Sequence, residues 1–558
     1  MKRVILTSLP YWSPIIPPSG LASLKSYLEQ KDYKVQIIDL NVKTESLQFY
    51  YDFFDVLKKA IPTDKRGTFF NIGHEVLRTF LMLHLYCEEE NDYRNVGKKI
   101  ISKWFFENVE DLIIDEIKKI ISDYLIILKE YTKFLVEYYD PFAIGASVYK
   151  TNIPLTLFFY KYVKSFKKDI KTLVGGGAFV DFHAIRSENF ETLLDISGDY
   201  IDKIFIGPGE RLLHSYLEGN LPEDQRYYVN SERHQDKDEE FFRLFDNSDF
   251  NMRKYSHLAA TTSVSCPFKC SFCNEFEFWG NYRKRPIDVV VKEMETLYKY
   301  HRRVLFFMTD SLLNPTVDEL SEKIIEKKLP FFYDTYFRID NASTKLENTL
   351  KWRNGGLYRV RIGIESGSPK MLELMNKKIS IEQIKAALTS LANAGIKTTT
   401  YWVIGHPDET EEDFQMTLDL IEEMKNNIWQ AECNVFQYFY SGGQNSDDAW
   451  AEKRIPLYTD EEIKYLKFNE WELDIYPKRD IIFERMHRFI SHCKKLGIPN
   501  PYSSYEHWDA DERWRKIHKN AVPALEMVVE QDTDLSPCEI KVMAAQSSLI
   551  NDEETFNF

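Results

Sequence analysis

The sequence contains no apolar run that approaches the roughly 18 residues that a membrane-spanning helix needs. It also lacks the opening pattern of a secretory signal: MKRVILTSLPYWSP breaks at Pro10 without a small-residue cleavage site, so we predict a first strand there. Only seven of the 558 residues are cysteine, and their uneven spacing fits a reducing compartment. These shortages predict a cytoplasmic protein without a membrane span.

Positive charge is also in short supply. The formal net charge is -15, which argues against a protein that binds mainly to nucleic-acid phosphates, although a local basic groove stays possible. With 44% hydrophobic and 28% charged residues, the composition is that of an ordinary globular protein. The length favours several domains, so we expect a multi-domain protein for which nucleic acid is an unlikely partner.

The first part of the chain has the pattern of a parallel α/β domain. β-Branched runs alternate with helical periodicity, which is typical of a doubly wound sheet whose ligand lies outside the carboxyl ends of the strands. We place this Rossmann-like domain at residues 1–225. The expected strands lie at 3–9, 34–40, 141–149, 171–179 and 202–210.

A long segment, about residues 44–138, interrupts this domain with helical periodicity and many aromatic residues. Two interpretations stay open: extra helices that cover the sheet or a dimer face, or a lid over a substrate channel. The run Gly175–Gly177 ends a predicted strand, where glycine lets a bulky ligand approach the backbone, although plain turns use glycine too. The run does not match G-x-G-x-x-G, so a dinucleotide site is not supported.

A second register of strands and helices follows a predicted linker at residues 226–254. Its strand–helix repeats predict a partial (β/α)6 barrel over residues 255–445, whose chemistry belongs at the carboxyl ends of the strands. The expected strands lie at 257–265, 303–310, 330–340, 358–366, 397–405 and 432–440.

Three cysteines, Cys266, Cys270 and Cys273, crowd the loop after the first barrel strand. A structural zinc site wants four ligands, usually in two pairs, and no second C-x-x-C occurs in the chain. Three thiolates in one loop fit an iron–sulfur cluster with one open iron instead. The other cysteines are isolated, and we predict that they are buried apolar residues. Of these, only Cys433 has a predicted position near the cluster site. The isolated cysteines are Cys87, Cys433, Cys493 and Cys538.

The motif C-x-x-x-C-x-x-C, with Phe272 before its last cysteine, resembles the cluster motif of the radical S-adenosylmethionine (SAM) enzymes. The resemblance implies that the three thiolates hold a [4Fe–4S] cluster whose fourth iron binds the amino and carboxylate groups of SAM. It implies cleavage of SAM to a 5′-deoxyadenosyl radical, with an electron donor such as flavodoxin or ferredoxin.

By the same resemblance, the ends of the later barrel strands bind SAM. Thr309-Asp310-Ser311 stands where the family often has a GGE-like segment, but the glycines are absent and Asp310 serves equally well as a strand-end cap. The GIESG segment resembles residues that hold the ribose and carboxylate, and VIGHPDET resembles a turn that packs on adenine. The residues assigned to SAM are Phe272, Asp310, Arg338, Glu365, Ser366 and Gly405.

The α/β domain ahead of the barrel is similar to the cobalamin-binding domains of the vitamin-B12-associated branch of that family. Many such domains carry D-x-H-x-x-G after the first strand, but here the loop reads P-Y-W-S-P and the first histidine is His74. Cobalt would therefore lack a histidine from this loop, and loss of cobalamin stays possible. The residues assigned to cobalamin are Tyr11, Trp12, Ser147, Gly175, Gly176, Gly177, Gly207 and Glu210, and Tyr11 and Trp12 read equally well as packing aromatics.

The resemblance implies a class B-like methyltransferase that methylates an unactivated carbon or phosphorus of a natural product, a peptide or a lipid. The alternatives are cyclisation, ring contraction or oxidation without methyl transfer, and a radical SAM enzyme whose B12-like domain is an empty scaffold. A non-enzymatic iron–sulfur regulator has no use for a barrel with Arg338 and Glu365 at its mouth.

The last part of the chain, residues 446–558, is polar and predicted to be mostly helical. Its segment 502–518 is dense in tyrosine, tryptophan and histidine, which favours either a substrate-facing wall or ordinary packing on the barrel. The stretch from about residue 531 lacks apolar periodicity and reads as a loose tail.

Overall fold

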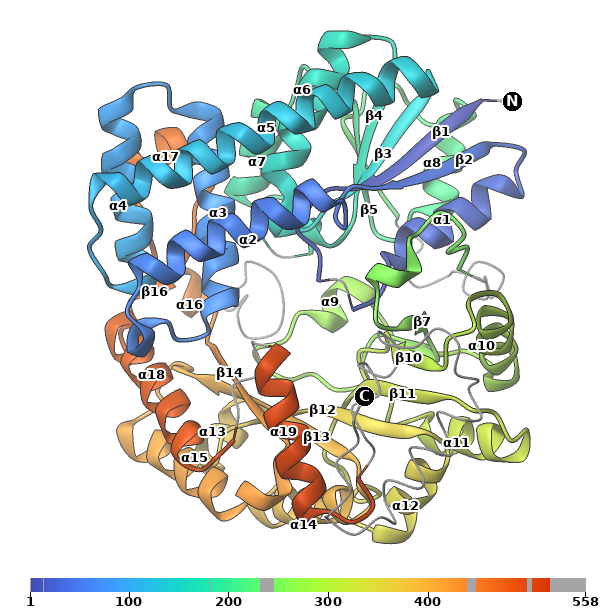
Figure 1. Cartoon of the computed structure of the whole chain (residues 1–558), viewed down its shortest axis with the longest axis vertical. Helices are drawn as coiled ribbons and strands as arrows, with labels where there is room; N and C mark the ends of the chain where they lie inside the picture. Colours follow the sequence, from blue (N-terminus) through green and yellow to red (C-terminus); the bar gives the residue numbers. More distant parts are fainter. Residues whose placement is uncertain are drawn as a thin grey trace.

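The computed structural model describes residues 2–13, 15–180, 182–230, 245–438, 448–498 and 504–521. Two six-stranded sheets organise the molecule, one in the upper and one in the lower half of Figure 1. No helix in those ranges combines the length and apolar character that crossing a bilayer would take.

The upper sheet is parallel throughout, in the order β2-β1-β3-β4-β5-β6. Its strands are rich in valine, isoleucine and leucine because helices cover both faces. This order confirms the predicted doubly wound class, and the short strand β6 begins inside the segment expected to be a linker. The strands are β1 (Arg3–Ser8), β2 (Lys34–Asp39), β3 (Ala143–Ser147), β4 (Lys171–Gly175), β5 (Lys203–Ile206) and β6 (Tyr227–Val229), and the main connecting helices are α1 (Ser19–Glu29), α6 (Ile153–Phe166), α7 (Glu188–Ile196) and α8 (Glu210–Leu217).

The predicted insertion forms four helices on one flank of this sheet (Figure 1). The longest of them, α5, packs on α6, and α3 packs against α17 from the far end of the chain. The insertion shares one continuous apolar core with the rest of the molecule. These helices are α2 (Thr44–Ala60), α3 (Phe69–Tyr86), α4 (Glu90–Phe105) and α5 (Asp111–Tyr139), and α17 spans Asp460–Leu466.

The lower sheet is a curved parallel sheet in the order β14-β13-β12-β11-β10-β7. Within the described residues no ladder joins β7 to β14, so the barrel is partial, as predicted. Its strands are β7 (Leu258–Ala260), β10 (Leu305–Met308), β11 (Phe332–Phe337), β12 (Leu357–Glu365), β13 (Lys397–Ile404) and β14 (Gln430–Val435). Its helices are α10 (Ile287–His301), α11 (Val317–Glu326), α12 (Leu346–Asn354), α13 (Pro369–Leu374), α14 (Ile381–Asn393) and α15 (Glu411–Glu423).

The carboxyl ends of the upper sheet face the middle of the molecule. In Figure 1, β1 runs from the marked N-terminus toward the centre, and the other strands of its sheet are parallel to it. Helix α9 (Glu275–Trp279), which belongs to the cysteine loop, lies between the two sheets (Figure 1). The arrangement brings the ligand-binding edges of two α/β units toward one region.

The C-terminal part is less helical than predicted, because a two-stranded antiparallel hairpin interrupts it. Strands of three residues carry too little alternation to be recognised in the sequence. The elements are α16 (Asp448–Ala451), β15 (Arg454–Pro456), β16 (Trp471–Leu473), α18 (Arg479–Lys495) and α19 (Ser504–Ile517).

Helix α19, the aromatic-rich segment, packs at the amino-terminal end of the barrel. Trp514 lies against Trp429, just before β14, and Asp511 pairs with Lys397 at the start of β13 at 2.7 Å. For residues 509–518 the hypothesis of a substrate-facing wall is therefore wrong and packing on the barrel is confirmed, whereas the side chains of residues 502–508 lie outside the description. The predicted loose tail and Cys538 lie outside the described residues.

Candidate functional site

The cysteine loop is closed at its base by a short antiparallel ladder. Strand β8 (Ser263–Val264) pairs with β9 (Arg283–Lys284), and the Ser265 hydroxyl donates to the Gly280 carbonyl at 2.6 Å. Because β8 directly follows β7, this ladder holds the three cysteines at the carboxyl end of the barrel.

Neighbouring strand ends support the loop from the side. The Ser271 amide donates to the Met375 carbonyl at 3.1 Å, and the Asn376 side chain donates to the Lys269 carbonyl at 2.6 Å. These contacts tie the loop to the segment that follows β12, so its position depends on the barrel as well as on its own sequence.

Asp310 anchors the base of the same loop. Its carboxylate is fully buried and accepts hydrogen bonds from the Thr262 amide at 3.0 and 3.1 Å and from the Ser263 hydroxyl at 2.6 Å. Burial raises the pKa of Asp310, although these hydrogen bonds oppose the rise. The contacts are those of a strand-end cap, and the assignment of Asp310 to SAM stays a prediction.

The three thiols are half-buried and free of disulfides. Burial raises the pKa of Cys273 to about 12 and also raises that of Cys266. Among the described residues, no three His, Cys, Asp or Glu side chains are grouped as ligands for a metal ion. An iron–sulfur cluster attaches each thiolate to a different iron, so its ligands do not converge on one point as those of a single ion do. Three cysteines in one loop match the number of protein ligands of a cluster with one open iron.

Arg338 connects the cysteine loop to the end of β11. Its Nη1 lies 3.2 Å from Cys270 Sγ, and its guanidinium lies over the Phe268 ring, 4.1 Å from the centroid. The Asn314 side chain fixes its backbone through two hydrogen bonds, at 2.7 and 2.8 Å. Nη2 is buried and has no hydrogen-bond partner, so the guanidinium has an open donor beside the cysteines that suits a carboxylate.

Glu365 and Ser366 lie at the end of β12, and both take part in the structure of their own turn. Glu365 has a positive φ of 71° and pairs with Lys377 at 2.8 Å. The Ser366 hydroxyl accepts from the Ser368 amide at 3.1 Å and contacts the Thr417 hydroxyl at 3.2 Å. Their roles toward SAM stay predictions, as does that of the half-buried Phe272.

The turn after β13 is shaped by a buried ion pair. Gly405 has a φ of 83°, and its amide donates to Glu409 Oε2 at 3.0 Å, which also accepts from Arg485 Nη1 at 2.9 Å. A Cβ at position 405 would lie 2.4 Å from Ile482 of α18, so glycine is required there. Helix α18 thus fixes the turn that the resemblance assigns to adenine.

We predict that the Glu409 carboxyl in this turn makes the free energy of unfolding depend on pH. Burial raises the pKa of Glu409 to about 7, against the hydrogen bonds from Gly405 and Arg485, so the folded chain holds a proton that the unfolded chain releases above about pH 4.5. Glu409 therefore contributes stability below that pH, and the contribution is lost as the pH rises toward 7. Relative to Glu409→Gln, the wild type should lose about 2 kcal/mol of unfolding free energy between pH 5 and 8. Urea unfolding of both proteins at four pH values measures this, and a constant difference would contradict it.

At the carboxyl edge of the upper sheet, Tyr11 and Trp12 pack on aromatic rings of their own half. Tyr11 stacks on His74 of α3 with ring centroids 3.9 Å apart, and Trp12 stacks on Tyr149 at 4.3 Å. The Trp12 amide also donates to Asn41 at 2.8 Å. These are the contacts of packing aromatics, and their assignment to cobalamin stays a prediction.

The glycines of residues 175–177 pack closely against neighbouring segments of the upper half. A Cβ at Gly176, where φ is 126°, would lie 2.6 Å from the Val148 carbonyl, and one at Gly177 would lie 3.1 Å from the Tyr149 ring. Gly176 and Gly177 thus pack on the loop after β3, Gly175 packs on Phe205 of β5, and the role of the run toward cobalamin stays a prediction. Of the other residues assigned to cobalamin, Ser147 ends β3, Gly175 ends β4, Gly207 follows β5 with a φ of 93°, and Glu210 accepts from Ser23 of α1 at 2.6 Å.

The Gly176→Ala variant should be destabilised by about 1–3 kcal/mol, because alanine must adopt a positive φ against the backbone of Val148. Gly20→Ala is the matched control: it lies in α1 with no heavy atom within 4 Å of the added Cβ, and it should be neutral or slightly stabilising. Urea midpoints of both variants test this, and equal midpoints would contradict the packing account.

A comparison with known proteins shows which protein family the barrel in the lower half resembles. Residues 261–421 match the model of the Radical SAM superfamily. Residues 261–421 are a radical SAM domain. Members of this superfamily use a [4Fe–4S] cluster and SAM. Over 170 residues the chain is 32% identical to the anaerobic magnesium-protoporphyrin IX monomethyl ester cyclase of Rubrivivax gelatinosus, an alignment that covers 29% of this chain and 30% of that protein. The chain spans roughly a third of the length of the curated relatives it matches.

Two solved structures share the complete architecture around the radical SAM domain. The radical SAM methyltransferase TsrM from Kitasatospora setae, with cobalamin and a [4Fe–4S] cluster bound, matches 93% of this chain and 99% of its own, with a TM-score of 0.59 and 15% identity. OxsB, a cobalamin-dependent SAM radical enzyme with aqua-cobalamin and SAM bound, matches 84% of this chain and 56% of its own, with a TM-score of 0.53 and 15% identity. At these identities the likeness shows the fold, and it confirms the predicted fold class.

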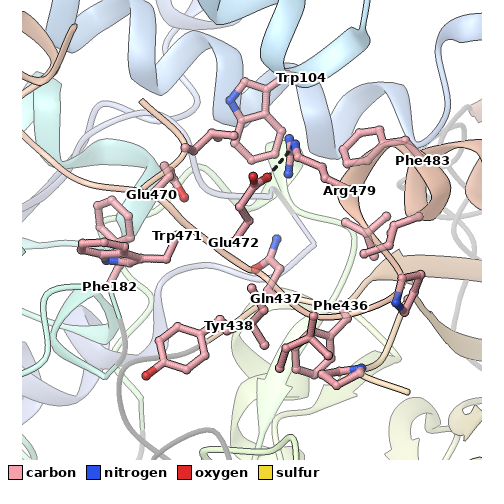
Figure 2. Close-up of a pocket in the computed structure, with 18 of the residues that line it drawn as sticks. Trp104, Phe182, Phe436, Gln437, Tyr438, Glu470, Trp471, Glu472, Arg479 and Phe483 are labelled. Carbon is pink, nitrogen blue, oxygen red and sulfur yellow. Dashed lines mark ion pairs between the residues drawn. The ribbon is translucent and has the colours of Figure 1, made fainter. Parts of the chain in front are cut away.

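A cavity adjoins the radical SAM domain at the ends of β13 and β14 (Figure 2). Of the residues assigned to SAM or cobalamin, Gly405 alone lines it. Its other walls come from segments far apart in the sequence that no motif connects, which is why the sequence did not reveal the cavity. Among its lining residues are Trp104, Lys150, Phe182, Phe436, Gln437, Tyr438, Glu470, Trp471, Glu472, Arg479 and Phe483.

One wall of the cavity is braced by a buried ionic network. Glu75 and Arg78 of α3 lie 3.2 Å apart, Lys150 lies 3.0 Å from Glu75 and 3.3 Å from Glu470, and Arg78 also pairs with Glu470. Burial opposes ionisation of Glu75, but Lys150 and Arg78 outweigh it and lower the pKa of this carboxyl. The network joins the insertion, the upper sheet and the C-terminal hairpin segment.

Proposed function

We propose that this chain is a radical SAM enzyme that binds cobalamin between its two sheets and methylates an unactivated carbon or phosphorus atom. Cys266, Cys270 and Cys273 would hold the [4Fe–4S] cluster. When bound, the reduced cluster supplies the electron that cleaves SAM, and cobalamin serves as the methyl carrier. The observation that carries the proposal is Arg338, which touches Cys270 with one guanidinium nitrogen and has the other buried and unpartnered.

In this proposal, different residues of the chain bind SAM and hold the cysteine loop in place. Arg338 is placed to hold the SAM carboxylate through its open donor, since guanidinium pairs strongly with carboxylate. Asp310 and the β8–β9 ladder keep the cysteine loop in place at the carboxyl end of the barrel, where its three thiolates would hold the cluster. The turn at Gly405, held by Glu409 and Arg485, offers backbone groups to adenine.

Cobalamin and methyl transfer are supported by the architecture. The carboxyl edge of the upper sheet faces the cysteine loop (Figure 1), and the TsrM and OxsB structures, which hold cobalamin, share this arrangement of domains. The stacked pairs Tyr11–His74 and Trp12–Tyr149 present aromatic surface at that edge. TsrM is described as a methyltransferase, which favours methyl transfer.

A second candidate is cyclisation without methyl transfer. It is favoured by the 32% identity of the radical SAM domain to the Rubrivivax gelatinosus cyclase. The proposed substrate is a natural product, a peptide or a lipid in either case, and the proposed electron donor is a flavodoxin or a ferredoxin. A methyl group retained in the product from labelled SAM separates methyl transfer from cyclisation.

The test is cofactor content after anaerobic purification and reconstitution. We expect about four iron and four sulfide per chain, about one cobalt after loading with hydroxocobalamin, and deoxyadenosine formation with SAM and a reductant. Iron without retained cobalt would contradict the cobalamin proposal and favour an empty scaffold. Loss of both the iron and the SAM cleavage would overturn the proposed function as a whole.

A further inference from the structure

The aromatic cavity at the ends of β13 and β14 is built for a flat ligand. It holds about 1200 Å³ of space between atoms, the open mouth included. Figure 2 shows indole, phenyl and phenol rings around it, contributed by α4, by the loop after β4, by the segment after β14, by β16 and by α18. Rings give large rigid contact surfaces for a planar aromatic molecule. The rings are those of Trp104, Phe182, Phe436, Tyr438, Trp471 and Phe483.

Glu472 places an unsatisfied acceptor in this wall. Its Oε2 is buried and receives no hydrogen bond. The nearest cationic atom, Arg479 Nε, lies 3.9 Å from Oε2, a distance too long for a hydrogen bond (Figure 2). Arg479 directs its Nε and Nη2 donors to the Lys103 carbonyl, at 3.4 and 3.0 Å, and lies over the Trp104 ring. The arginine therefore offsets the charge of Glu472 but does not satisfy the oxygen.

Neighbouring carboxylates on the wall are already engaged. Glu470 pairs with Arg78 and Lys150, and Glu188 pairs with Arg454 at 2.8 Å. A buried carboxylate oxygen without a donor is unfavourable, so a ligand that brings an N–H group recovers that free energy. Because Arg479 offsets the charge, a neutral N–H donor suits the site and a full cation is not needed.

We infer that the cavity binds a flat aromatic molecule with an N–H group at its edge, and that this group donates to Glu472. The inference rests on the proposed function, because it makes this molecule the substrate. Gly405 lines the cavity and also belongs to the turn assigned to adenine, so the bound ring lies beside the SAM site. The substrate class is therefore N–H-bearing heteroaromatics, free or as a side chain of a larger molecule.

A matched pair of probes tests this. Indole and benzofuran have the same shape, but benzofuran replaces the N–H by oxygen. Titration calorimetry on the protein loaded with cluster and hydroxocobalamin should show indole binding about tenfold tighter than benzofuran, because hydrogen bonds to charged groups are among the stronger ones. Glu472→Met keeps the volume but loses the acceptor, and should reduce the indole preference to within about twofold. The control Glu484→Met, on the exposed side of α18, should keep the full preference.

The outcomes separate this inference from the proposed function. Equal affinities of the wild type for the two probes would overturn the inference, as would displacement of indole when hydroxocobalamin is loaded, since the corrin would then occupy the cavity. The control Glu484→Met should keep the iron content and the deoxyadenosine formed without substrate. A wild type that prefers indole but neither retains iron nor cleaves SAM would overturn the proposed function and leave the binding site standing.

Discussion

The Cys270→Ala variant is expected to lose SAM cleavage completely and to stay folded. Cys270 lies on the half-buried loop, outside both sheet cores, so its removal costs little packing. It would leave the cluster with two protein thiolates and Arg338 without its sulfur contact. Deoxyadenosine is measured by chromatography after anaerobic reconstitution with SAM and dithionite, together with iron content and the urea midpoint.

Cys87→Ala is the matched control for this variant. Cys87 is buried at the end of α3 in the insertion, far from the loop in sequence, and its thiol donates only weakly to the Glu89 carbonyl, at 3.6 Å. We expect wild-type iron content and SAM cleavage with a modest loss of stability. Wild-type deoxyadenosine formation by Cys270→Ala, with its cluster verified absent, would refute the mechanism.

The Asp334→Asn variant should show the largest loss of stability, about 3–5 kcal/mol. Asp334 of β11 is fully buried and holds Arg359 and Arg361 of β12, with Arg361 Nη2 at 2.8 Å. Burial alone would raise the pKa of Asp334, but the two guanidinium groups lower it, so the carboxylate is charged in the fold. The amide removes the carboxylate charge that both guanidinium groups contact.

The matched control replaces an exposed aspartate. Asp55 and Lys58 form an exposed pair at 3.3 Å on α2, so Asp55→Asn should change the unfolding free energy by less than about 0.5 kcal/mol. Urea unfolding followed by circular dichroism measures both variants. A loss below about 1 kcal/mol for Asp334→Asn would show that the two arginines find other partners.

The sequence predicted the strands of the two sheets well where periodicity is strong. β12 and β13 are long and mostly buried, and both were expected within a residue or two of their observed ends. The strand β6 and the hairpin β15–β16 were missed because three-residue strands carry almost no alternation. Their pairing depends on distant partners, which local sequence does not express.

The candidate site shows the same division. The spacing of Cys266, Cys270 and Cys273 predicts their chemistry without a structure, since the expected ligands come from one loop. The sequence did not predict the direction of a side chain. Asp310 points to the base of the cysteine loop, and Arg338 points to the sulfur of Cys270. Both follow a barrel strand, so position alone did not separate a cap from an open donor.

Long-range assembly accounts for the rest. The wall of the aromatic cavity combines Trp104 of the insertion with Glu472 and Arg479 of the C-terminal part, and no motif marks any of them. The segment 502–518 drew attention by its rings, but composition does not tell which end of a barrel a helix covers. Trp514 and Asp511 show that it is the end away from the cysteines.

The buried network of Glu75, Arg78, Lys150 and Glu470 has a consequence for synthesis on the ribosome. Arg78 precedes Glu470 by 392 residues. At roughly 5–20 residues per second, that partner emerges about 20–80 s after the arginine. During this interval Arg78 of the insertion and Lys150 after β3 have only Glu75 of this network as a carboxylate partner, so the wall cannot take its final packing until Glu470 has been synthesised.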